Sequence, residues 1–426
     1  MNKSYIPKKA ENNHNTVSAS NYVSQQKEKQ LNTFSFIDNR LHLKQNIQGK
    51  PNNSCNPAQL KAHAGSYSNN QVAQRQSSDK PIQLLLTADT FSEQIETAGG
   101  VTDNIFFKAI RSGLLKFQKA GQPKSVKGRF IHNLYESITG PTQSTSTDKL
   151  KALDAIEHSA YAFLKTNVGR NTPVATNLQG VIGNLLEEVQ QEHQEVISTE
   201  VGRGRVPYFR GQETLSKQQL AETQQDWQSI LAGQRSIVIH NATAEDKNVQ
   251  PEGFSNEILS MLHRTLGSNG GRELVHAINN DPHAVNILPK HPDSIAMMGG
   301  GGTVGETQAL ATGTLAAPVA GPQRGSILRV EPNMSDTQYP SQDANGYAIP
   351  SPAWLLFAHE LIHTRHNQLG MNYRNLDKAN YSGGMPNAIW SNAEEHTTID
   401  LGVPRVNITE NSLRAEHGLS ERYGHR

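Results

Sequence analysis

The chain has 426 residues, and its 40 Lys and Arg against 39 Asp and Glu give a formal net charge of +1. A charge so close to zero excludes the strong overall field of a typical nucleic-acid-binding protein, and it gives no reason to expect attraction to an acidic membrane surface. The single cysteine, Cys55, excludes an internal disulfide and a cysteine-based zinc site.

The first 85 residues differ in composition from the rest of the chain. They are rich in Asn, Gln, Ser and Lys and poor in large apolar residues. Such a segment buries too little apolar surface to offset the entropy of ordering, so residues 1–85 are predicted to form a disordered leader. The basic start MNKSYIPKK is not followed by an apolar segment, so no Sec signal peptide is expected. No apolar run approaches the roughly 18 residues of a membrane span.

Residues 90–250 are predicted to form a helical domain. Apolar residues recur at helical spacing over 150–165 and again over 181–197. The short apolar run RSIVIHN at 235–241 predicts a strand that leads into the next domain.

Residues 251–426 mix helical and strand patterns, which predicts an α+β domain. Two helices are expected over 253–278, with a break at Gly270 and Gly271, and strands over 283–289 and 325–332. Ser351 and Pro352 suit the N-cap and first position of a further helix that ends before Gly370. The glycine-rich run 299–305 contains G-x-G-x-x-G, but it lacks a preceding strand pattern and a following helix, so a loop over the active site is expected there.

The stretch AHELIH places H-E-x-x-H in this last helix. Residues four apart lie on one face of a helix, so His359 and His363 can bind one metal ion. Glu360 then lies beside the ion, where a general base for a water molecule is needed. The competing interpretation is an apolar core helix whose two histidines are incidental.

A zinc site of this kind needs a third ligand. His366 is seven residues from His359, about 10 Å along the helix axis, so the two cannot share one ion; His366 is expected to be solvated or to support a ligand. A carboxylate from a second helix is the usual alternative. Glu394 and Glu395, about 30 residues downstream, both suit that position.

Four motifs in order give the C-terminal part a resemblance to a known family. GGREL (270–274), HELIH (359–363), EEHTT (394–398) and TENSLRAEHG (409–418) resemble the motifs of bacterial effector zinc metallopeptidases that include the NleD effector. The HELxH and EExxT pairing also resembles that of the clostridial neurotoxin light chains. The resemblance covers about residues 250–426.

The resemblance implies a zincin-like domain, with a small sheet, an active-site helix and a helix that carries the third ligand. His359, His363 and Glu395 would bind Zn²⁺, Glu360 would be the base, and Glu394 and Thr398 would orient the ligands. An oxyanion would be stabilised by an Arg and a Tyr, for which Arg414, Arg422 and Tyr423 are the candidates. A solvated terminal helix is the equally weighted alternative for these three residues.

The resemblance also implies a host protein as the substrate, and some members of the family cleave host signalling kinases. FIDNR (36–40) and QVAQRQSSDKPIQLL (71–85) resemble the leaders of toxins loaded into extracellular contractile injection systems. The sequence therefore predicts a secreted effector or toxin that reaches the host cytoplasm by a non-Sec route, with the injection apparatus as a partner.

Two other functions remain open from the sequence. The chain could be a binding protein whose helical domain holds a host partner and whose zinc is structural. Alternatively, it could be a structural or loading component of an injection particle, with the leader as its working part. Glu360 favours the enzyme, because a structural zinc site needs no base.

Overall fold

The computed structural model describes residues 87–120, 143–292, 302–304, 310–314, 317–377, 392–399 and 408–424. All of them belong to one compact unit of the chain, which spans Asn56–Arg426. The predicted leader lies outside the described residues.

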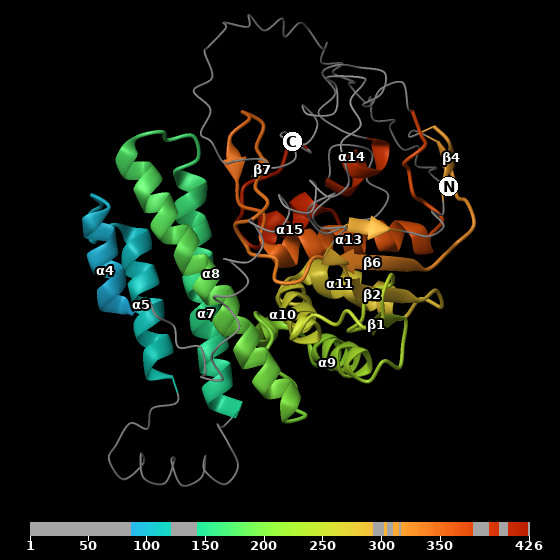
Figure 1. Cartoon of the computed structure of the whole chain (residues 1–426), viewed down its shortest axis with the longest axis horizontal. Helices are drawn as coiled ribbons and strands as arrows, with labels where there is room; N and C mark the ends of the chain where they lie inside the picture. The colour runs from blue at the N-terminus through green and yellow to red at the C-terminus, as the bar shows by residue number, and fades with distance from the viewer. Residues whose placement is uncertain are drawn as a thin grey trace, which may run out of the picture. The chain divides into compact units, whose positions relative to one another are not determined.

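Four helices open the described chain: α4 (Ala88–Thr97), α5 (Ile105–Lys119), α7 (Gln143–Thr166) and α8 (Pro173–Gly202) (Figure 1). The two predicted helical patterns are confirmed, since 150–165 lies in α7 and 181–197 lies in α8. The periodic apolar residues of α8 form its buried face, from Leu178 through Ile182 and Leu186 to Ile197. Pro173 at the first position and Thr172 as N-cap start α8, and the Thr172 hydroxyl accepts a hydrogen bond from the backbone of Ala175.

A mixed sheet follows, with strand order β1-β2-β6-β3. The parallel strands β1 (Ile237–Ile239), β2 (Val285–Pro289) and β6 (Ser326–Val330) confirm the three predicted strands. β3 (Gly302–Val304) adds to β6 in the antiparallel direction. The loop predicted over 299–305 is therefore wrong at 302–304, where backbone pairing at a sheet edge forms a strand without an apolar pattern; the other residues of that run lie outside the described chain.

The helices α9 (Lys217–Leu231), α10 (Phe254–Thr265) and α11 (Asn269–Asn279) accompany the sheet, after the short 3₁₀ helix η1 (Gln212–Thr214). The predicted break at Gly270 and Gly271 is displaced, because both residues lie in the first turn of α11. A Cβ at Gly271 would lie 1.9 Å from the carbonyl oxygen of Thr265, so glycine permits the tight reversal between the two helices.

The chain ends in α13 (Ala353–Gln368), α14 (Ala393–Ile399) and α15 (Glu410–Glu416). α13 packs against α10, α11 and β6, and it contacts both α14 and α15. Two small hairpins complete the described chain: β4 (Thr312–Gly313) with β5 (Pro318–Val319), and β7 (Ser341–Gln342) with β8 (Ala348–Ile349).

The ends of α13 test two sequence predictions. The N-cap is Pro352, not Ser351, and no side chain of the N-cap residue closes the helix. The Ser351 hydroxyl instead lies 2.6 Å from that of Ser341 and accepts a hydrogen bond from Arg414. The C-terminal prediction is confirmed, because Gly370 adopts the left-handed conformation that ends a helix (φ 67°).

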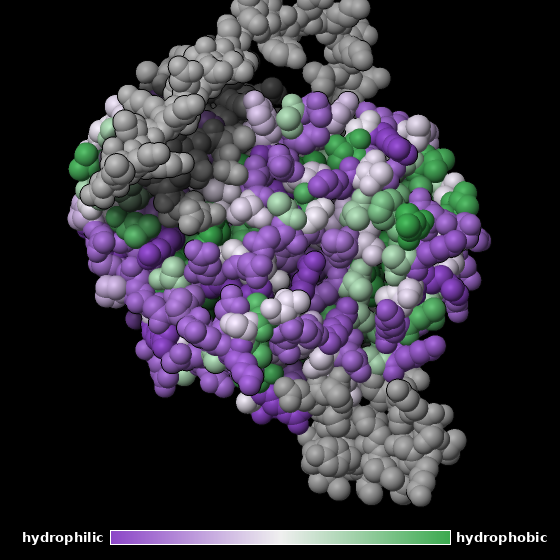
Figure 2. Space-filling view, turned by 180° about the vertical axis from the view of Figure 1, so that it is seen from behind, coloured by the Kyte–Doolittle hydropathy of each residue, from purple (hydrophilic) through white to green (hydrophobic). Residues whose placement is uncertain are grey.

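One apolar cluster runs from Phe91 in α4 to Leu419 beyond α15. The predicted domain boundary near residue 250 falls between β1 and α10, and the cluster continues across it. The described fold is α+β, as predicted. On the face shown in Figure 2, polar side chains predominate and apolar ones are scattered. None of the described helices is both long and apolar enough to cross a membrane.

Candidate metal centre

The H-E-x-x-H motif and the downstream glutamate pair come together between α13 and α14. The Nε2 atoms of His359 and His363 lie 3.0 Å apart. Glu395 places one carboxylate oxygen 3.2 Å from Nε2 of His359 and the other 3.4 Å from Nε2 of His363. In a tetrahedral zinc site with bonds of 2.0–2.1 Å, neighbouring donor atoms are separated by about 3.3 Å. The spacing of the three side chains therefore fits a zinc ion.

The opposite nitrogen of each histidine contacts its own buried carboxylate. Nδ1 of His359 lies 2.8 Å from Glu410, and Nδ1 of His363 lies 2.7 Å from Glu394. Such contacts fix the ring orientation and place the proton on Nδ1, which leaves Nε2 as the metal-binding atom. Burial alone would lower the pKa of both histidines, but the neighbouring carboxylates outweigh it and raise the pKa of each above its usual value. A metal ion bound here would therefore displace the proton on each Nε2.

Glu394 supports the site rather than binding the same ion. Its Oε1 atom contacts Nδ1 of both His363 and His366, at 2.7 and 2.6 Å, and Oε2 accepts a hydrogen bond of 2.7 Å from the backbone of Tyr373. Distances of 2.6–2.7 Å are those of hydrogen bonds, and they are shorter than the donor separation around zinc. His363, His366 and Glu394 therefore form a hydrogen-bonded group, although they lie close enough together to be a metal cluster.

His366 is completely buried, so of its two predicted roles the solvated one is wrong. Its contact with Glu394 makes it a supporting group. Thr398 also belongs to this layer, since its hydroxyl lies 3.2 Å from Nδ1 of His363 and 3.4 Å from Glu394.

The carboxylates of the site are held in their ionised form. Burial alone would raise the pKa of Glu394, but the charge and hydrogen bonds of His366 and His363 outweigh it and lower the pKa to about 2. Burial likewise opposes the ionisation of Glu395, but His363 and His359 outweigh this effect and hold the pKa of Glu395 well below the usual range. Ionised carboxylates are what a divalent cation requires of its ligands and of their partners.

Glu360 is half-buried, whereas the neighbouring His359 is 5% exposed and His363 6% exposed. It follows His359 directly in α13, so its side chain points to a different side of the helix from the ligands. Its role as the base stays a prediction of the sequence.

Arg414, one of the residues predicted to stabilise the oxyanion, is bonded to other groups of the protein. Arg414 is completely buried and donates to Glu410, Ser351 and the carbonyl oxygens of Pro350 and Ser420. With all its nitrogens engaged, Arg414 is not available to an oxyanion, so the structure does not support its predicted role. It acts instead by holding Glu410.

Arg422 also holds Glu410, to which it donates a hydrogen bond of 2.7 Å, and it donates to the backbone of Gly424. Tyr423 is 43% exposed, and its backbone bonds to Gln342 in β7. Its hydroxyl remains a candidate for the oxyanion, as the resemblance implies.

Glu410 is the member of the site that the sequence did not assign. It lies in the motif TENSLR, where Thr409 caps α15 through a reciprocal hydrogen bond with Ser412. The burial that would raise its pKa is outweighed by Arg422, Arg414 and His359, which hold the pKa well below its usual range. The helix dipole already accounts for an acidic residue in the first turn of a helix. The sequence therefore gives no separate indication that Glu410 contacts His359.

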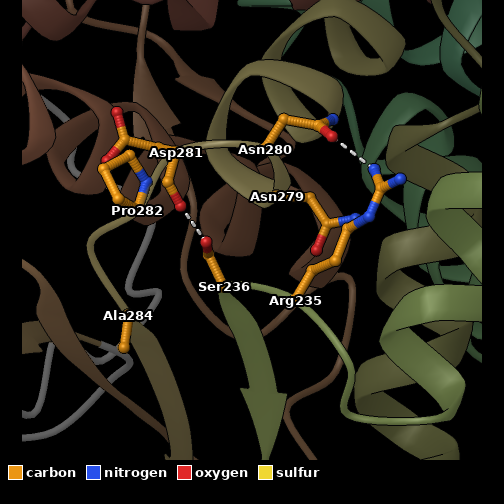
Figure 3. Close-up of a pocket in the computed structure, with 7 residues that line it drawn as sticks. All are labelled: Arg235, Ser236, Asn279, Asn280, Asp281, Pro282 and Ala284. Atoms are coloured by element: carbon orange, nitrogen blue, oxygen red, sulfur yellow. Dashed lines mark hydrogen bonds between the residues drawn. The ribbon is translucent and has the colours of Figure 1, made fainter.

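A separate surface hollow of about 410 Å³ is lined by Arg235, Ser236, Asn279, Asn280, Asp281, Pro282 and Ala284 (Figure 3). None of the predicted site residues lines it. Most polar groups there bond to one another or to the protein, as Arg235 does to Asn280 and Ser236 to the backbone of Asp281, whereas the buried Oδ1 atom of Asn279 has no hydrogen-bond partner among the described residues. The residues that line the hollow therefore do not form a catalytic site.

No protein-family model, no curated protein and no solved structure matches the chain. The interpretation of the site rests on its own geometry and on the motifs in the sequence.

Proposed function

We propose that the chain is a zinc metallopeptidase, with His359, His363 and Glu395 as the zinc ligands. The observation that carries the proposal is the spacing of three donor atoms at 3.0–3.4 Å, with a separate buried carboxylate behind each histidine. The mixed sheet with an antiparallel edge strand beside α13 is compatible with the zincin-like architecture that the motifs imply.

The chemistry would be peptide-bond hydrolysis. A bound zinc ion would supply Lewis acidity towards the carbonyl group and a lowered pKa for the attacking water. The Glu360 carboxylate takes the proton of that water and passes it to the leaving amine nitrogen. Glu394, Glu410 and Thr398 keep the ligand side chains in place during this transfer.

The biological setting is a further part of the proposal and rests on the sequence resemblance. The chain would act as an effector or toxin that leaves its cell by a non-Sec route. An injection apparatus would recognise the leader, and the substrate would be a protein of the host cytoplasm, with signalling kinases as one candidate class.

The first test is metal content. Elemental analysis of the wild-type chain is expected to give one zinc per chain, and the double variant His359→Ala/His363→Ala is expected to give none. The exposed His158 provides a control, and His158→Ala keeps its zinc. A folded wild-type chain that holds no zinc after reconstitution would overturn the proposal.

The second test separates an enzyme from a zinc-stabilised binding protein. The wild-type chain and Glu360→Gln are incubated with a peptide library made from a proteome digest, and new N-termini are identified by mass spectrometry. Both proteins are expected to hold zinc, and only the wild type to generate new termini. Equal cleavage by the variant would exclude Glu360 as the base, and no cleavage by the zinc-loaded wild type would favour the binding function.

A further inference from the structure

The loop 333–337, which follows β6, is held by side chains of the helices α8 and α10. The Glu257 carboxylate of α10 accepts hydrogen bonds of 2.9 and 3.0 Å from the backbone nitrogens of Asn333 and Met334. Gln190 of α8 donates to the carbonyl oxygen of Met334 at 2.7 Å and accepts from the backbone of Asp336 at 3.0 Å. The position of this loop is thus set by the helices rather than by the sheet.

The same loop carries a buried charge. Asp336 is completely buried, and Arg264 of α10 donates two hydrogen bonds to its carboxylate, at 3.1 and 2.6 Å. Tyr161 of α7 donates to it at 3.2 Å. Arg264 also contacts Glu157 of α7 at 2.8 Å, so α7 supports the carboxylate both directly and through the arginine.

The remaining contact of Asp336 is with the active-site helix. Its Oδ1 atom accepts a hydrogen bond of 2.9 Å from the backbone nitrogen of Ala353, the first residue of α13. The N-cap of α13 is Pro352, whose side chain has no acceptor, and Ser351 is engaged elsewhere. Asp336, 17 residues away in the sequence, therefore accepts from one of the backbone N–H groups that have no partner within the helix, and its negative charge suits the helix N-terminus.

We propose that α7 and α8 are a positioning part of the zinc site, acting through Asp336. The carboxylate fixes the start of α13, and His359 lies six residues further along the same rigid helix, about 9 Å away. Tyr161, Gln190 and Asp336 are positioning residues, since they act on the ligands only through the helix. The inference rests on the proposed function for its link to zinc, whereas the capping of α13 stands on the contacts alone.

This assignment gives the helical segment a function other than that of an independent targeting or binding module. An independent module would tolerate loss of its contacts with loop 333–337 without any change at α13. A positioning element would not, because the end of α13 would open more often.

The test uses the full-length chain and three single variants. Tyr161→Phe removes the hydrogen bond to Asp336, and Gln190→Met removes the two bonds to the loop. Ser146→Ala is the matched control, because it removes a buried hydrogen bond of 2.8 Å between Ser146 of α7 and Glu200 of α8 without touching the loop. The readouts are amide hydrogen exchange of the peptide covering 353–358 and the rate of zinc release to a chelator.

Tyr161→Phe and Gln190→Met are expected to speed exchange in 353–358 and zinc release by on the order of threefold or more. This is less than the roughly 10- to 100-fold loss of affinity on removing a direct partner of a ligand, because the residues act one layer further out. Ser146→Ala is expected to change neither rate. Equal effects in all three variants, or no change in exchange in the first two, would overturn the proposal. A wild-type chain without zinc would refute the proposed function, and the exchange rates would still decide whether α7 and α8 hold the helix.

Discussion

The Oε2 atom of Glu410 lies 2.8 Å from Nδ1 of His359, although 51 positions separate the two residues. Arg422 donates to the same oxygen and Arg414 to the other, each at 2.7 Å. A carboxylate between two guanidinium groups stays ionised, and it keeps the proton of His359 on Nδ1. The C-terminal segment thereby orients the ring of His359, which is one of the proposed metal ligands.

Glu410→Gln removes the charge that balances the two arginines. We expect the free energy of unfolding to fall by about 3–5 kcal/mol, because buried charges are left without a partner. Zinc affinity should fall by about 10- to 100-fold, because His359 loses its orienting carboxylate. Urea denaturation of the metal-free protein and chelator competition measure the two effects. The exposed Glu421 is the control, and an unchanged zinc affinity in Glu410→Gln would contradict the role given to Glu410.

Neighbouring glutamates in α14 are expected to differ in their effect on zinc. Glu395→Gln removes a ligand and should weaken zinc binding more than Glu394→Gln, which removes a partner of His363 and costs about 10- to 100-fold. Both affinities are measured by competition with a chelator of known strength. If the order is reversed, Glu394 is the third ligand.

Two glycines in helices should respond in opposite directions to the same substitution. Gly271→Ala places a methyl group against the carbonyl oxygen of Thr265 and should destabilise the fold by at least about 1–3 kcal/mol. Gly180→Ala, in α8 with nothing within 4 Å of the added atom, should stabilise it by about 1 kcal/mol. Thermal or urea unfolding measures both. A neutral Gly271→Ala would show that the turn between α10 and α11 can relax.

The buried His263 predicts loss of stability in acid. Burial lowers its pKa to about 4, with a further contribution from Arg264 against the opposing bond to the Tyr208 carbonyl oxygen. The unfolded chain binds this proton near pH 6.5 and the folded chain does not, so stability present above pH 6.5 is lost as the pH falls towards 4. The loss is on the order of 3 kcal/mol.

Urea unfolding of the metal-free protein at several pH values between 7 and 4 tests this prediction. His263→Gln, which cannot titrate, should lose less stability over that range than the wild type. The exposed His158 is the control, and His158→Gln should follow the wild type. Parallel curves for His263→Gln and the wild type would show that His263 is not the source.

The sequence predicts the elements whose signal is local. The apolar spacing in α7 and α8, the short apolar run of β1, and Gly370 at the end of α13 all determine nearby backbone structure, and each is confirmed. The proximity of His359 and His363 is also predicted from local sequence, because both residues lie on one helix.

The contacts that the sequence did not reveal are formed between distant residues. Ser351 looks like an N-cap, but Arg414, 63 positions later, takes its hydroxyl group, and Asp336 caps the helix instead. β3 forms because its backbone pairs with the free edge of β6. The glycine-rich sequence of β3 does not itself indicate a strand. Glu410 reaches His359 only after α15 packs on α13.

The spread of the site along the chain has a consequence during synthesis. α13, with both histidines, leaves the ribosome before Glu395, and the carboxylate network closes only when Arg422 has been added. Because chains fold from the N-terminus as they emerge, the helices that hold Asp336 are available before the residues that complete the metal centre. On the proposed function, a nascent chain would therefore gain a complete metal centre, and with it peptidase activity, only after Arg422 has been added.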